Sequence, residues 1–168
     1  MDLKGGNMMT SQKLTLNHIK EENKKYNEKQ KIELNDQYHT YIYPNFDPTR
    51  VSKMIKTLIK DYVDIQSKKG VKTDLGAGDL ANLYMVIEFS DIADMPKALT
   101  AKVKMLEEVA KSEHIKTIYD SFPKESLKKV EDAANGFVDF ISSAADKNAN
   151  KANEDILKKV EELTQEES

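Results

Sequence analysis

Histidines and carboxylates are the side chains of this chain that could bind a metal ion or transfer protons. The histidines fall in three different predicted elements: His18, His39 and His114. None of them belongs to a compact ligand spacing such as HExxH. Glu88, Asp91 and Asp94 are close enough in sequence to share a divalent ion. They lie at the end of a predicted helix before Pro96, where acidic side chains are ordinarily solvated, so we expect no metal site.

Nucleophiles and phosphate-binding loops are the next chemistry to consider. The sequence contains no cysteine, which excludes disulfides, thiolate metal sites and cysteine nucleophiles. Gly76 and Gly78 lack the Lys and Ser or Thr that complete a phosphate-binding loop. No serine lies in the GxSxG pattern of hydrolases. We therefore expect a protein that is not an enzyme and that uses no cofactor.

An aromatic cluster next to Arg50 offers a possible binding surface. Its members are close together in the sequence: Tyr38, Tyr41, Tyr43 and Phe46. Such rings can stack on nucleic-acid bases, or they can pack a hairpin against the helix that follows. We favour packing, and we retain Tyr41, Tyr43 and Phe46 as candidate partner-binding residues.

The charge of the chain weighs against binding to nucleic acid. Lys and Arg number 26 and Asp and Glu number 29 in 168 residues, which gives a net charge of −3. Arg50 is the only arginine, whereas phosphate contacts favour arginine for its bidentate geometry. Nucleic acid is therefore an unlikely partner. No apolar run approaches the roughly 18–20 residues of a membrane span, and the first residues do not resemble a signal peptide, so we expect no membrane association.

A β-hairpin is predicted near residues 31–43. Residues 31–34 and 39–43 are rich in β-branched and aromatic side chains, and the turn-prone residues 35–37 lie between them. Two registers are possible for the second strand. Either His39, Tyr41 and Tyr43 share the packed face, or Thr40 and Ile42 do.

Helices account for most of the remaining sequence. Asp47 and Pro48 form a helix-start signal, and apolar residues then recur at i, i+3, i+4 and i+7 as far as Ile65, with Asp61 and the other charged residues mostly away from the stripe. A second helix, from about Gly78 to Phe89, is apolar nearly all round and should lie centrally. Further helices are predicted over about 97–111, 113–120 and 123–145, with another possible over 16–27. The predicted fold class is mostly α, a bundle of about five helices with a small N-terminal β-hairpin.

The chain divides into three parts. Residues 1–13 are expected to be a flexible N-terminal segment, and residues 14–146 form a single helical domain. Residues 147–168 comprise a polar linker and a short amphipathic helix with Ile156, Val160 and Leu163 on one face. That helix either docks onto its own bundle or engages a helix of a partner. Ile156, Val160 and Leu163 are accordingly further candidate partner-binding residues.

Two stretches carry a resemblance to a known family. They are YIYPNFDPTR, residues 41–50, and DLANLYMVIEFSDIADMP, residues 79–96. Together they resemble tail assembly chaperones of long-tailed bacteriophages and prophages of Gram-positive bacteria. The resemblance implies a mainly helical protein that binds the long tape measure protein, keeps it soluble and assists assembly of tail tube subunits. It also implies location in the bacterial cytoplasm and absence from the finished virion.

The function expected from the sequence is therefore that of a non-enzymatic tail assembly chaperone. Its partners would be the tape measure protein and the tail tube protein, and a homo-oligomer is possible. The alternative is a small nucleic-acid-binding regulator of a phage or mobile element, which would use the Lys-rich N-terminal half and the tyrosine cluster. A regulator would lose its ligand on nuclease treatment, whereas a chaperone would not.

Overall fold

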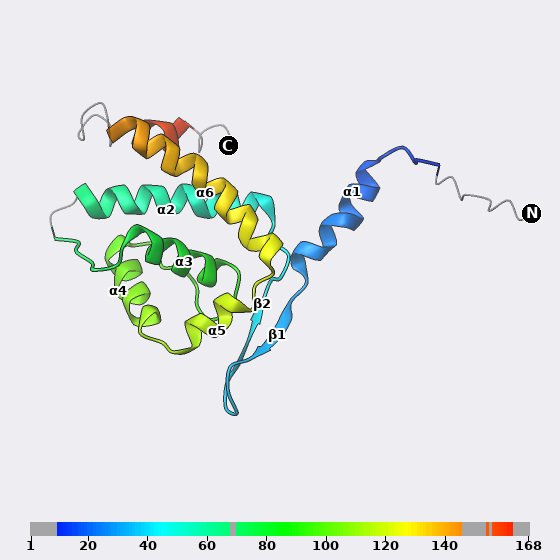
Figure 1. Ribbon diagram of the computed structural model, residues 1–168, viewed down its shortest axis with the longest axis horizontal. Coiled ribbons are helices and arrows are strands. Elements are labelled where there is room, and N and C mark those ends of the chain that lie inside the picture. The colour runs from blue at the N-terminus through cyan, green and yellow to red at the C-terminus, as the bar shows by residue number, and fades with distance from the viewer. Residues whose placement is uncertain (1–9, 68–69, 146–153, 155, 163–168) are drawn as a thin grey trace, which may run out of the picture.

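A computed structural model describes residues 10–67, 70–145, 154 and 156–162 of the chain (Figure 1). The elements, in chain order, are α1 (Leu16–Asn23), the 3-10 helix η1 (Lys24–Asn27), β1 (Gln30–Glu33), β2 (His39–Ile42), α2 (Pro48–Ser67), α3 (Ala77–Glu88), α4 (Leu99–Ala110), α5 (His114–Asp120) and α6 (Lys124–Ala145). Residues 156–162 are also helical. In this part of the chain no helix is both long enough and apolar enough to cross a membrane.

The prediction of a mostly α chain with a small hairpin is confirmed, but the count of about five helices is wrong. These elements include six α-helices and one 3-10 helix. The difference arises at the N-terminus, where α1 and η1 are short and have no buried residue. Apolar residues recur at helical spacing where one face of a helix is buried, so two short helices without buried residues give only a weak signal.

The hairpin adopts the second of the two registers considered. Ile32 pairs with Thr40 across the antiparallel strands, and Thr40 and Ile42 are buried while Tyr41 is exposed. The turn is closed by Asn35, whose Oδ1 accepts hydrogen bonds from the backbone N–H groups of the two residues before β2. The hairpin therefore presents Thr40 and Ile42 to the helical body.

The free edge of β2 joins the hairpin to the end of α3. The N–H of Tyr43 donates to the carbonyl of Phe89 at 2.9 Å, and the N–H of Asp91 donates to the carbonyl of Tyr41 at 3.0 Å. These bonds satisfy edge groups of β2 that would otherwise need water. They fix the hairpin against the helices.

The loop between β2 and α2 is fastened to the start of α6. Ser126 Oγ donates to the carbonyl of Pro44 at 2.6 Å and accepts from the N–H of Phe46 at 3.4 Å. Lys129 Nζ donates to the carbonyl of Phe46 at 3.1 Å. Three polar backbone groups of this loop thus depend on side chains about 80 residues away in sequence.

Helix α3 occupies the centre of the body, as its apolar composition predicts. Figure 1 shows it between α2 on one side and α4 and α5 on the other, and contacts join it to all three. Most of its side chains are buried: Leu80, Leu83, Tyr84, Met85, Val86 and Ile87. Helices α2, α4 and α5 therefore cover α3, and α6 packs on α2.

The start of α2 follows the predicted cap. Asp47 Oδ1 accepts from the N–H and the Oγ1 of Thr49, at 2.8 Å and 2.7 Å, and Pro48 is the first helical residue. Partial burial acts to raise the pKa of Asp47, but the hydrogen bonds from Thr49 and the nearby Arg50 charge act more strongly and lower it. The folded state therefore favours the charged carboxylate.

Replacing Asp47 with alanine should lower the free energy of unfolding by about 1 kcal/mol near neutral pH, because a capping acceptor is lost. A carboxylate whose pKa is lowered on folding stabilises the fold above its unfolded pKa of about 4. That contribution disappears as the pH falls through the lowered value. Urea denaturation measures the free energy of unfolding of the wild type and of Asp47→Ala at neutral pH and below about pH 3. The difference between the two proteins should be smaller in acid. A difference that does not change with pH would contradict a stabilising role of the charged carboxylate.

Candidate partner-binding groove

Each of the three histidines makes a contact with a neighbouring side chain or backbone group. His18 forms a capping box with Thr15 at the start of α1, in which each residue's side chain accepts from the other's backbone N–H. His39 lies edge-on to Tyr41, and His114 lies edge-on to Tyr38. Among the described residues no group of three or more potential ligands is placed to hold a metal ion.

Two of the carboxylates at and beyond the end of α3, those of Glu88 and Asp91, bind cations from other parts of the chain. Arg50 Nε donates to Glu88 Oε1 at 2.8 Å, and Lys29 Nζ donates to Asp91 Oδ2 at 2.8 Å. The first pair links α2 to α3, and the second links the hairpin to the segment after α3. The expectation that these acids are simply solvated is therefore incomplete, because Glu88 joins α3 to α2 and Asp91 joins the segment after α3 to Lys29, next to the hairpin.

The aromatic cluster mostly packs the hairpin, which was the favoured interpretation. Phe46 is completely buried, with its ring stacked on Phe89 at 3.8 Å between centroids and edge-on to Phe122 at 5.1 Å. We assign Phe46 to the core and not to a partner-binding surface. Tyr43 is half-buried beneath Arg50, whereas Tyr41 is 39% exposed and is the member of the three with a ring open to a partner.

Arg50 is half-buried and makes several contacts within the fold. Its guanidinium lies 4.6 Å from the Tyr43 ring centroid and 5.0 Å from that of Phe89. A second donor, Nη2, binds the carbonyl of Glu88. Arg50 and the aromatic cluster therefore build the junction between hairpin and helices, and this arrangement gives no support to the alternative in which they stack on bases.

The C-terminal amphipathic segment docks onto the bundle. Ile156 and Val160 are buried and form a small apolar cluster with Val63 of α2, against which Ile59 and Leu157 also pack. Of the two alternatives for this segment, the structure shows docking. The predicted linker 147–153 and the third candidate residue, Leu163, lie outside the described residues.

An apolar groove runs beside this docked segment. Its volume is about 680 Å³, and its walls come from α2, α6 and the C-terminal segment. Most of the lining is apolar: Pro48, Val51, Ile55, Ile59, Ala133, Gly136, Ile156 and Val160. Sequence periodicity predicted the α2 stripe but could not show that part of it, the buried Val51 and Ile55 and the half-buried Ile59, lines a hollow between the other two elements.

The width of the groove depends on a glycine in α6. A Cβ built on Gly136 would meet no atom within 4 Å, so the space beside it is open. Side chains at this position would project into the groove that Gly136 lines. A concave, mainly apolar surface with charged residues at its margin is typical of sites that receive the apolar face of a helix.

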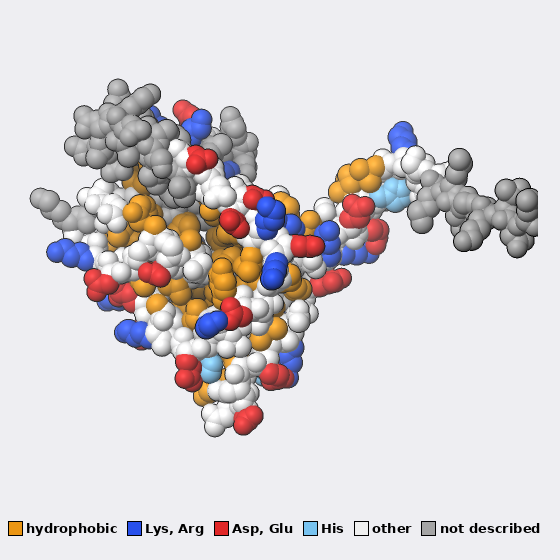
Figure 2. Space-filling model, viewed as in Figure 1, with side chains coloured by type: hydrophobic (Ala, Val, Ile, Leu, Met, Phe, Trp, Pro, Cys, Tyr) orange, Lys and Arg blue, Asp and Glu red, His pale blue; other side chains and the backbone are white. Residues whose placement is uncertain are grey.

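A second exposed apolar surface lies on the N-terminal arm, residues 10–27. Figure 1 shows α1 projecting away from the body. Figure 2 shows apolar side chains on this arm as well as grouped on the body. Those of the arm include Leu14, Leu16 and Ile19, which are 61%, 64% and 38% exposed. The weak periodicity of this stretch gave no indication that its apolar residues would be left uncovered.

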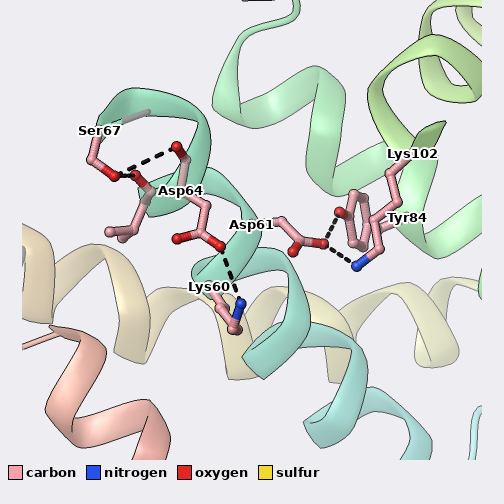
Figure 3. A network of polar contacts seen from close by, with 7 residues as sticks. Lys60, Asp61, Asp64, Ser67, Tyr84 and Lys102 are labelled. Atoms are coloured by element: carbon pink, nitrogen blue, oxygen red, sulfur yellow. Dashed lines mark hydrogen bonds and ion pairs between the residues drawn. The ribbon is translucent and has the colours of Figure 1, made fainter. Parts of the chain in front are cut away.

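A buried polar network was missed by the sequence analysis. Asp61 is almost fully buried in α2, where its Oδ2 accepts from the Tyr84 hydroxyl at 2.5 Å and from Lys102 Nζ at 2.6 Å (Figure 3). Burial, together with the hydrogen bond to Asp61 and its charge, raises the pKa of Tyr84. These two hydrogen bonds join α2, α3 and α4. The network holds these three helices together and is not part of the lining of the groove between α2, α6 and the C-terminal segment.

Comparison with known proteins finds a relative that aligns with nearly the whole chain. It is 35% identical over 155 residues to the "SPbeta prophage-derived uncharacterized protein YomO" of Bacillus subtilis (strain 168), an alignment that covers 92% of this chain and 93% of the relative. No solved structure gives a significant match. The YomO family model matches residues 16–167, which include both stretches of the tail-chaperone resemblance, the groove and the docked segment. The chain therefore belongs to the YomO family.

Proposed function

We propose that this protein is a phage tail assembly chaperone that holds apolar helices of the tape measure protein in the groove between α2, α6 and the C-terminal segment. The observation that carries the proposal is the groove itself, a mainly aliphatic hollow on a highly charged chain, in which Pro48, Ala133 and Gly136 are exposed while the Val and Ile side chains form a buried or half-buried floor. The prophage origin printed in the name of the Bacillus relative supports a phage setting. So does the resemblance of residues 41–50 and 79–96 to tail assembly chaperones.

The mechanism would be non-covalent burial of apolar surface. Each square ångström of apolar client surface removed from water contributes about 25 cal/mol, and the charged outer faces of the helices keep the complex soluble. No bond is made or broken, so the protein would act without a cofactor and without catalysis. It would work in the bacterial cytoplasm, promote assembly of tail tube subunits around the tape measure protein, and be absent from the finished virion.

Filling the groove should abolish client binding. Gly136→Trp places a large ring where the backbone has open space, and we expect at least a tenfold loss of tape measure protein captured. The experiment co-expresses the tagged chaperone with the tape measure protein of the same phage genome. It measures the soluble, co-purified client by quantitative mass spectrometry, with and without nuclease.

Gly136→Ala is the matched control. It adds one methyl group, leaves most of the groove open, and should stabilise α6 by about 0.5–1 kcal/mol because glycine is a poor helix former. Circular dichroism verifies that both variants fold. Equal capture by wild type and Gly136→Trp would overturn the groove as the site. Absence of the client from wild type, with nuclease-sensitive nucleic acid in its place, would instead favour the regulator.

A further inference from the structure

The exposed aliphatic side chains of the described residues gather on the N-terminal arm. Leu14, Leu16 and Ile19 are the large aliphatic residues that remain exposed in this part of the chain, and α1 has no buried residue. Single apolar side chains on a surface are ordinary, but a group of them on one short element marks an interaction site. The arm therefore presents an apolar face that its own fold leaves uncovered (Figure 2).

The arm cannot cover this face by turning back onto its own body. Asn23 and Lys24, at the junction of α1 and η1, have right-handed helical backbone angles, so helical backbone continues over residues 16–27. The base of the arm is held by α6, where Lys129 Nζ lies 5.4 Å from the centroid of the Tyr26 ring. Because the base is fixed and the backbone beyond it is helical, α1 points away from the body (Figure 1). Its apolar face is available only to another molecule.

The body offers a matching surface in the groove. Its floor is aliphatic, and α2 already accepts one helix beside it, since Ile156 and Val160, four positions apart, pack on Val63. Leu16 and Ile19 are three positions apart and lie on the same face of α1. The arm thus offers the same kind of aliphatic pair that the C-terminal segment seats on α2.

The arm also leaves the body beside the groove. Lys129, which contacts the Tyr26 ring of η1, is one of the residues that line the groove. A two-fold axis at this place would let each of two copies lay its arm in the groove of the other. Such an exchange is reciprocal, so it covers both apolar surfaces of both copies and closes the assembly at two chains.

The charges of the chain favour an arm on a second body over an arm on a second arm. Residues 10–27 contain four lysines and two glutamates, a net charge of +2, which leaves −5 for the rest of a chain whose total is −3. Two arms would repel each other, whereas an arm and the rest of a second copy attract. At the edge of the apolar face, Glu22 follows Ile19 by three positions. It is exposed, as is Lys159 in the groove lining, and neither bonds to another described residue.

We propose that two copies of this chain exchange their N-terminal arms, with Leu16 and Ile19 of each copy seated in the groove of the other. The inference concerns the protein without its client and does not rest on the proposed function. A tape measure helix would have to displace the arm, so the exchange would keep both apolar surfaces covered until a client arrives.

Size-exclusion chromatography with light scattering tests the exchange on the full chain. We expect the wild type to have about twice the 19.1 kDa mass of one chain. Leu16→Asp combined with Ile19→Asp should give the mass of one chain, because carboxylates would have to enter an apolar groove. Both residues are exposed, so the variant should keep its fold, which circular dichroism verifies. Tyr38→Asp changes an exposed ring of the hairpin and is the matched control that should remain dimeric.

Cysteine cross-linking tests whether the groove receives the arm. The natural chain has no cysteine, so Ile19→Cys on one chain and Gly136→Cys on a second, co-expressed chain place one thiol on each proposed surface. A short bismaleimide should join them into a covalent dimer at least tenfold more often than it joins Ile19→Cys to Lys104→Cys, a position on α4 outside the groove lining.

Several results would overturn the exchange. They are a monomeric wild type, a dimer that survives the double Asp substitution, and equal cross-linking to the groove and to α4. A covalent dimer formed by Ile19→Cys alone would show that arms pair with arms, which also contradicts the inference. Capture of the tape measure protein is measured separately, so each of these results would leave the proposed function standing.

Discussion

Replacing Asp61 with alanine is expected to lower the free energy of unfolding by about 3–5 kcal/mol, because it leaves the ammonium group of Lys102 buried without its counter-charge. The side chains of Lys102 and Asp61 are only 11% and 6% exposed. Tyr84 loses its acceptor at the same time. Urea denaturation at neutral pH measures the change, and a loss below about 1 kcal/mol would show that water or a rearranged neighbour replaces the carboxylate.

The double variant Asp61→Leu with Lys102→Met is the control for this interpretation. It removes both charges and restores apolar volume, so it should be clearly more stable than Asp61→Ala. Lys102→Met alone leaves the carboxylate with the Tyr84 hydroxyl as its remaining partner of the network and should destabilise the fold as well. A double-mutant cycle that gives additive effects would contradict coupling between the two residues.

Replacing Phe46 with alanine is expected to cost about 3–5 kcal/mol, the usual range for removing a buried aromatic ring. The ring has no exposed surface and lies between Phe89 and Phe122. Its loss would open a cavity where the hairpin loop meets α3 and the segment before α6. Thermal and urea denaturation measure the change.

Tyr41→Ala is the matched control for Phe46. Tyr41 lies in the neighbouring strand with much of its ring exposed, so its loss should cost less than about 1 kcal/mol. If Phe46→Ala were as stable as Tyr41→Ala, the assignment of Phe46 to the core would be wrong. A surface role in partner binding would then have to be reconsidered.

Local signals predicted the elements whose sequence and burial agree. Asp47 and Pro48 marked the first turn of α2, and the all-round apolar character of residues 80–89 marked α3 as central. Both signals act within a few residues along the chain. The mostly helical class and the hairpin could therefore be predicted without knowledge of the tertiary packing.

The candidate site could be predicted only in part. Asp61 reads as one more charged residue of an amphipathic helix, because its partners Tyr84 and Lys102 lie on other helices. Similarly, Ile156 and Val160 are four residues apart, and this spacing is the same in a helix that packs on its own bundle and in one that binds a partner. The sequence alone therefore could not distinguish the two. The open groove depends on how three separate elements dock, and no local pattern records that.

The attachment of the hairpin loop to Ser126 has a consequence for synthesis on the ribosome. The loop around Pro44 and Phe46 emerges early, but the hydroxyl that satisfies its backbone groups follows about 80 residues later. Closing so long a stretch of nascent chain is entropically unfavourable until the intervening helices have formed. The loop can thus reach its final geometry only after most of the domain has been translated, and release of the chain before Ser126 would leave these groups facing water.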